Sequence, residues 1–154
     1  MRTMLLSFKS DVYERVISGE KIFEHRKVFP NETIKAYLYV SAPKKVITGI
    51  MILQNKKNIA DWLEEYKDDK QAVKRIKEYL EHHKVVMQIA EFQPTNEIPL
   101  EKLRKDNPGF VVPQMYYFLD GTQLGNYLER EIKPIGKKIK HDFSKIDSSQ
   151  VCVH

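Results

Sequence analysis

The sequence predicts an α+β fold, in which a small mixed sheet or open barrel is surrounded by peripheral helices. Short segments of alternating apolar and polar residues predict strands that are joined by turns. Segments with apolar residues at helical spacing lie between them, without the regular strand–helix alternation of a parallel sheet. With 154 residues, of which 42% are hydrophobic, the chain can form one domain with its own core.

The N-terminal segment predicts a strand, a helix and a second strand. An apolar run at residues 4–8 predicts the first strand. A helix then begins at Ser10, which is a favourable N-cap residue, and ends at Gly19. Residues 21–28 alternate as in a strand, so every second side chain is expected on the same face. One face then carries Ile22, Glu24 and Arg26, and the other carries Lys21, Phe23 and His25.

Two further strands follow. Residues 34–40 alternate strictly between apolar and other positions, which predicts a half-buried strand. Residues 46–53 form an apolar strand, and Gly49 within it marks a bulge or a close backbone approach.

Residues 58–83 predict a helical insert between strands. Asn58 is expected to cap a first short helix, and the apolar residues of a second helix follow from Ala72. The acidic pair Asp68–Asp69 is expected to separate the two helices.

The remaining segments complete the α+β pattern. They are a strand at 85–92, a short helix at 97–105, aromatic-rich strands at 110–112 and 115–119, a helical stretch at 124–130 and a lysine-rich segment at 133–145. We therefore expect a single domain over residues 1–146, followed by a mobile tail over residues 147–154.

The charge of the chain is concentrated near its N-terminus. The formal net charge is +5. Residues 1–57 hold 11 basic and 5 acidic side chains, whereas residues 58–107 hold 9 and 11. A basic face suits a phosphate-bearing partner, because binding releases counterions condensed on the nucleic acid. An ordinary lysine-rich surface explains the same balance equally well.

Several classes of protein are excluded by composition. No apolar run is long enough to span a bilayer, and the N-terminus lacks the apolar stretch and cleavage site of a secretory signal. Cys152 is the single cysteine, so no internal disulfide framework and no cysteine-rich zinc site can form. We expect a cytoplasmic protein without a membrane partner.

The densest chemistry lies in Gly19–Lys27, where ionisable side chains follow a helix end. Lysine is a mobile point donor, and arginine is a planar fork for phosphate or carboxylate. Glu24, between Lys21 and Arg26, is expected to stay ionised because positive charges flank it. Such a trio can bind a polar ligand or perform acid–base chemistry. From spacing alone, surface ion pairs on a solvated strand are the commoner explanation.

These residues resemble the ASCH (activating signal cointegrator homology) domain. Its recurrent motif, Gly-x-Lys-x-x-Glu-x-Arg, is matched by Gly19, Lys21, Glu24 and Arg26. The similarity extends from the Leu-Ser-Phe-Lys run at residues 6–9 to the strand at residues 46–53. Beyond that point the chain aligns only loosely with the family.

The resemblance implies a PUA-like open β-barrel with peripheral helices, in which the motif strand lines a cleft suited to RNA or a modified nucleotide. Some single-domain ASCH proteins resemble amidohydrolases acting on acetylated cytidine, and others resemble ribonucleases. In the amidohydrolase branch, a threonine three positions after the motif lysine is the nucleophile. This chain has Glu24 at that position and no hydroxyl between Lys21 and Pro30. A lysine-activated threonine mechanism therefore lacks its central atom.

Other side chains are weaker candidates for ligand binding. Lys9 belongs to the similar segment, and Tyr39 and Ser41 follow the paired strand, where they can reach a base or a phosphate. Tyr116 and Tyr117 can stack on a base, although aromatic residues in a strand more often belong to the core, and we expect only one of them to face a ligand.

No metal or cofactor is expected. His82 and His83 are adjacent, so on a helix their side chains point about 100° apart and rarely chelate one ion. His25 adds no recognised metal-binding pattern. Cys152 lies near the terminus without a basic helix N-terminus, so a catalytic thiol is not expected.

The leading hypothesis is an RNA- or nucleotide-binding protein that uses a basic cleft. Lys21 and Arg26 then contact phosphate or a base edge, while Glu24 holds them in place. A hydrolase in the same cleft is the alternative, either a ribonuclease or an amidohydrolase of modified nucleosides, with Lys21 as acid or electrostatic stabiliser and Glu24 as general base. A protein-interaction module in a transcription or translation assembly, docking through the acidic insert, is a third possibility.

Overall fold

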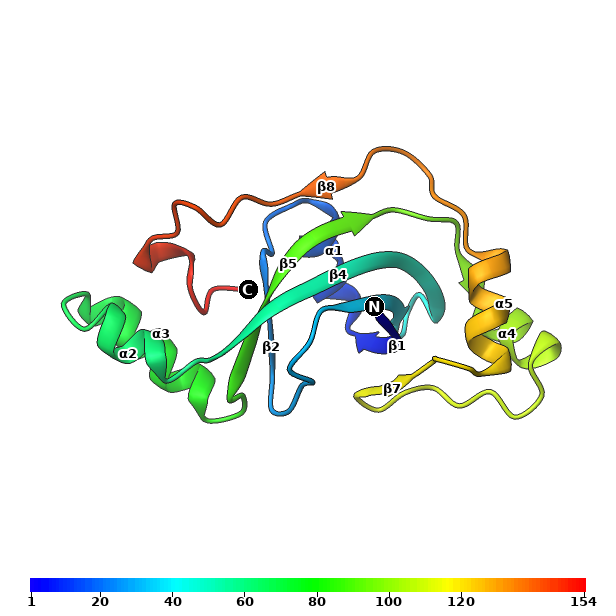
Figure 1. Cartoon of the computed structure of the whole chain (residues 1–154), viewed down its shortest axis with the longest axis horizontal. Coiled ribbons are helices and arrows are strands. Elements are labelled where there is room, and N and C mark those ends of the chain that lie inside the picture. Colours follow the sequence, from blue (N-terminus) through cyan, green and yellow to red (C-terminus); the bar gives the residue numbers. More distant parts are fainter.

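The computed structural model describes all 154 residues of the chain. Its centre is one mixed sheet of eight strands that curls into a half-barrel (Figure 1). The strands are β1 (Arg2–Phe8), β2 (Phe23–Arg26), β3 (Ile34–Val40), β4 (Val46–Asn58), β5 (Val85–Gln93), β6 (Ile98–Pro99), β7 (Tyr116–Phe118) and β8 (Ile139–Lys140).

The main path of the sheet follows the order β2–β5–β4–β3–β1–β7. β1 and β3 pair in parallel, and every other pair is antiparallel. The short strands β6 and β8 pair with β4 and β5. The expected α+β fold with a small mixed sheet is therefore confirmed.

Five α-helices surround the sheet, and one 3₁₀ turn lies near the C-terminus. They are α1 (Ser10–Ile17), α2 (Asp61–Glu65), α3 (Lys70–Leu80), α4 (Leu100–Asp106) and α5 (Gln123–Glu131), with the 3₁₀ turn at Ser148–Gln150. The pair α2–α3 lies at one end of the molecule, and α4–α5 lie at the other (Figure 1). No helix is both long and apolar enough to cross a membrane.

Strand β3 shows why the prediction of a half-buried strand was wrong. Its apolar residues Ile34, Ala36, Leu38 and Val40 join one large core cluster. Tyr37 and Tyr39 point to the other face and are also buried, in a second cluster that includes residues of α4 and α5. Because helices cover the face that a solvated sheet would leave open, alternation in this strand separates two cores rather than core from water.

Gly49 lies at a β-bulge, which is one of the two features expected of a glycine in this strand. The register between β3 and β4 shifts where Thr48 and Gly49 lie opposite Leu38. The φ angle of Gly49 is +81°, and a Cβ atom at this position would lie 2.6 Å from the Phe92 ring. A side chain is therefore excluded both by backbone conformation and by space.

Two predicted elements differ from the observed ones. The strand expected at residues 110–112 is absent, and Phe110 and Val112 instead pack as irregular chain against the second cluster. Asn58 does not cap a helix, because it is the last residue of β4 and pairs with Val85. The separation at Asp68–Asp69 is confirmed, since Asp69 is the N-cap of α3 and accepts bonds from two backbone N–H groups.

The C-terminal segment differs from the mobile tail expected over residues 147–154. Val151 and Cys152 are buried with Ala72 and Ile76 of α3 in a third core cluster. Arg75 donates to the carbonyl oxygens of this segment, at 2.6 Å to Ser148. The segment is held because Val151 and Cys152 add to the apolar cluster on α3 and Arg75 binds its main chain.

Candidate functional site

The chain enters the candidate site from the end of α1. After Ile17 the helix stops, Gly19 adopts φ +83°, and the backbone N–H of Lys21 donates to Arg15 O. Strand β2 begins only at Phe23. Lys21 therefore lies in a turn, where strand alternation does not apply, and its side chain lies on the same side as Glu24. The prediction that they occupy opposite faces was wrong.

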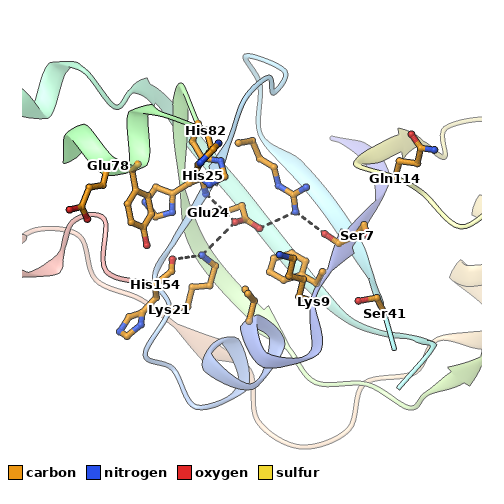
Figure 2. Close-up of a pocket in the computed structure, with 15 residues that line it drawn as sticks. Ser7, Lys9, Lys21, Glu24, His25, Ser41, Glu78, His82, Gln114 and His154 are labelled. Atoms are coloured by element: carbon orange, nitrogen blue, oxygen red, sulfur yellow. Dashed lines mark hydrogen bonds and ion pairs between the residues drawn. The ribbon is translucent and has the colours of Figure 1, made fainter. Parts of the chain in front are cut away.

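Glu24 lies between the two cations of the motif, and Figure 2 shows its ion pair with Lys21. Its Oε1 is 3.5 Å from Lys21 Nζ, and its Oε2 is 3.3 Å from Arg26 Nη2. Oε1 also accepts from the backbone N–H of His25 at 3.0 Å. The Lys21 side chain is 3% exposed and that of Glu24 is 7% exposed, so this is a buried ion network rather than the surface pairing that spacing alone favours.

Main-chain carbonyl oxygens accept further hydrogen bonds from Lys21 and Arg26. Arg26 Nη2 donates to Ser7 O at 2.8 Å, which ties β2 to β1. Lys21 Nζ donates to His154 O at 2.7 Å, so the C-terminal segment reaches the motif (Figure 2). The network thus joins three parts of the chain that are far apart in sequence.

Burial and neighbouring charges shift the pKa values of Glu24 and Lys21 in opposite directions. Burial by itself raises the pKa of Glu24, but Lys21 and Arg26 outweigh it and hold that pKa below its usual value. Burial also lowers the pKa of Lys21, and the attraction of Glu24 opposes this only in part. Glu24 therefore remains ionised at neutral pH, and its negative charge is shared between two cations.

A cavity of about 540 Å³ opens beside this network. That volume is within the range of small-molecule sites in proteins. Five of the seven residues expected from the sequence line it: Lys9, Lys21, Glu24, Arg26 and Ser41. Lys9 comes from the β1–α1 junction and Ser41 from the end of β3, so the parallel pairing of β1 with β3 brings them together.

Tyr39 and Tyr116 do not line this cavity. Tyr39 points to the opposite face of β3, where it is 3% exposed and packs in the second core cluster near Phe110. Tyr116 lies over the first cluster and contacts the Phe29 ring edge-on, with the ring centroids 5.6 Å apart. Both aromatic rings contribute to packing in the structure.

Sequence reasoning missed one wall of the cavity. It comes from the end of α3 and the turn after it, which contribute Glu78, Tyr79, His82 and His83. The backbone O of Arg26 accepts from the N–H of Lys84, and β2 pairs with β5 immediately after this turn. The insert thus lies against β2. The sequence feature that pointed to this wall was the pair of adjacent histidines at the end of an amphipathic helix. Only the tertiary fold shows what these histidines face.

No three histidine, cysteine, aspartate or glutamate side chains are grouped so that they could hold a metal ion. Burial raises the pKa of Cys152 to about 12, so its thiol stays protonated in the third core cluster. The ionisable side chains that line the cavity are those of the ion network, Lys9, Glu78, Tyr79 and the neighbouring histidines.

The curled sheet and the helices around it form an ASCH-like open barrel. No protein-family model matches the sequence, and no curated protein matches it. Solved structures of the ASCH protein from Zymomonas mobilis do resemble the chain. A variant of that protein with one tyrosine replaced by phenylalanine superposes with a TM-score of 0.65 at 17% identity, covering 86% of this chain and 100% of that one.

Two further structures of the Zymomonas mobilis protein agree with this result. Another crystal structure of this ASCH protein gives a TM-score of 0.64 at 18% identity, with coverage of 86% of this chain and 96% of that one. A serine-to-alanine variant gives 0.62 at 18% identity. The resemblance that the motif suggests is thus confirmed at the level of fold.

Proposed function

We propose that this ASCH-like protein binds RNA or a nucleotide-like ligand in the cavity beside the Lys21–Glu24–Arg26 network. The observation that carries the proposal is the network itself, because Glu24 holds the buried Lys21 and the part-buried Arg26 at the wall of a cavity of ligand size. The basic first third of the chain supports a phosphate-bearing partner. We place this activity in the cytoplasm, within a single domain.

The two cations keep donors available for a ligand. Arg26 makes both of its bonds through Nη2, which leaves Nη1 and Nε free to donate. Lys21 has three protons and directs two of them to His154 O and Glu24 Oε1, which leaves one. Lys9, at the rim, is exposed and pairs with no carboxylate. These donors suit a phosphate, a carbonyl oxygen or the edge of a base.

Geometry supports binding over general-base catalysis by Glu24. Its two oxygens are occupied by Lys21, Arg26 and the His25 N–H. Its pKa is held below the usual value, although burial works in the other direction. A general base acts best when its pKa is near the operating pH. Glu24 is instead suited to holding Lys21 and Arg26 in position.

Single-stranded RNA is expected to bind with an affinity that falls as salt rises. If Lys9, Lys21 and Arg26 neutralise three phosphates, the log–log slope is about −2. Lys9→Ala is expected to make the slope shallower by about 0.7, because one exposed phosphate contact is lost. Fluorescence anisotropy with a labelled oligonucleotide at several salt concentrations measures both values.

Lys105→Ala is the matched control for Lys9→Ala. Lys105 is also an exposed lysine, but it lies on α4 at the far end of the molecule from α3 (Figure 1). This variant should retain the slope of the unmodified protein. If Lys9→Ala and Lys105→Ala make the salt slope equally shallow, RNA is attracted to the surface as a whole and the cavity is not its binding site. If RNA does not bind even at low salt, RNA is not the ligand.

Acetylated cytidine is not expected to be hydrolysed at a rate typical of enzymes, which is about one turnover per second or more. The reason is that Glu24 stands where the hydrolase branch has its hydroxyl nucleophile, and this carboxylate is fully engaged. Incubation followed by chromatography for cytidine measures the activity. Turnover abolished by Ser41→Ala would instead identify a catalytic hydroxyl in the cavity and favour the hydrolase alternative.

A further inference from the structure

One wall of the cavity is built from aromatic and imidazole rings. It comprises His25 of β2 together with Tyr79 and His83 from the end of the insert, and we call it the histidine wall. The rings of His25 and Tyr79 meet edge-on, with centroids 4.7 Å apart. His83 lies 5.9 Å from Tyr79 and 6.3 Å from His25 by the same measure. The three rings therefore support one another in a fixed arrangement.

His25 carries an unsatisfied polar atom in this wall. The residue is 6% exposed, and its buried Nε2 has no hydrogen-bond partner. Buried polar groups are rarely left unpaired, because a missing hydrogen bond costs free energy. No protein group forms this bond with His25 Nε2. His25 lines the cavity, so a ligand there becomes a hydrogen-bond partner once a shift of the rings uncovers Nε2.

The wall is electrically neutral at neutral pH. Burial lowers the pKa of His25 to about 3, and burial likewise lowers the pKa of His83. A neutral imidazole has one nitrogen that donates and one that accepts. The wall thus offers flat rings with both donor and acceptor nitrogens. The positive charge at the cavity comes instead from Lys21, Arg26 and Lys9.

We propose that the histidine wall binds the base of a single nucleotide, while Lys21 and Arg26 bind the phosphate-bearing part of the same ligand. This inference rests on the proposed function and adds the part of the ligand that each end of the cavity recognises. A base has a planar ring that stacks on tyrosine or histidine and a mixed donor–acceptor edge. A sugar phosphate alone has no group that uses the ring faces, so it would leave the wall without a function.

The test measures binding of nucleoside monophosphates by isothermal titration calorimetry, with ribose 5-phosphate as the probe that lacks a base. Tyr79→Leu and His83→Ala each remove one ring from the wall. His141→Ala is the matched control. Its Nε2 is also buried without a partner and burial also lowers its pKa, but its ring packs near Phe143 and does not line the cavity.

At least one monophosphate is expected to bind 10-fold or more tightly than ribose 5-phosphate. Loss of one stacking ring is expected to weaken that binding by about 5- to 150-fold, whereas His141→Ala should leave it unchanged. Thermal melting establishes that each variant is folded, and the half-buried His83 provides the test if Tyr79→Leu unfolds.

Two results would overturn the inference, and they differ in what they imply for the proposed function. If ribose 5-phosphate binds as tightly as every monophosphate and both wall variants are unaffected, the wall does not recognise a base, while phosphate binding by Lys21 and Arg26 stands. If neither the mononucleotides nor single-stranded RNA binds, the proposed function fails together with the inference.

Discussion

Replacing Glu24 by glutamine is expected to lower the free energy of unfolding by about 3–5 kcal/mol, since removing one partner of a buried ion network leaves an uncompensated buried charge. Glutamine retains the shape of the side chain, so the change isolates the charge. Lys21 would then lie at 3% exposure beside Arg26 with no anion between them. Urea denaturation at neutral pH measures the effect.

Two comparisons separate this effect from a general cost of losing a carboxylate. Glu64→Gln breaks the exposed pair with Lys67, whose side chains are 83% and 62% exposed, and should change stability by less than about 1 kcal/mol. The double variant Lys21→Met with Glu24→Leu removes both buried charges and should recover much of the loss. If Glu24→Gln and Glu64→Gln cost the same small amount, the network is not a buried one.

His25→Phe is expected to reduce the dependence of stability on pH. The pKa of His25 in the folded protein is lowered by burial to about 3, against an ordinary value of 6.5. Between these two pKa values, His25 is protonated in the unfolded chain but not in the folded protein. The stability that neutral His25 contributes is complete above pH 6.5 and is lost as pH falls towards 3.

The expected loss from His25 alone is about 2 kcal/mol by about pH 5, because each unit of pKa difference corresponds to roughly 1.4 kcal/mol. Measurements between about pH 7 and 5 avoid the range in which carboxylates titrate. His25→Phe should flatten the curve by this amount, while retaining a ring beside Trp62 and Tyr79. A constant difference between the two proteins across this range would show that His25 can be protonated without unfolding.

The motif itself could be recognised from the sequence because its spacing is local. Gly19 ends a helix, and Glu24 and Arg26 lie two residues apart on the same face of a short strand, so their proximity follows from strand periodicity. Lys21 could not be placed in the same way. Its position depends on where β2 begins, and that depends on the turn after α1 rather than on alternation.

The histidine wall illustrates what local patterns cannot supply. Tyr79 and His83 lie more than fifty residues from His25 in the chain, and they meet because β2 pairs with the strand that follows the insert. The amphipathic pattern of the insert predicts which of its faces is buried. It contains no information about which strand that face packs against.

By itself, the sequence determined the elements that depend on neighbouring residues: the first helix with Gly19 just after its end, the break at Asp68–Asp69, an irregularity at Gly49, and the charged motif that follows the first helix. Tertiary structure alone decided that β3 is buried on both faces, that Tyr39 lies in the core while Tyr116 packs against it, and that the C-terminal segment reaches Lys21. The physical reason is that periodicity encodes which side chains share a face, whereas burial and partners depend on what the fold brings against that face.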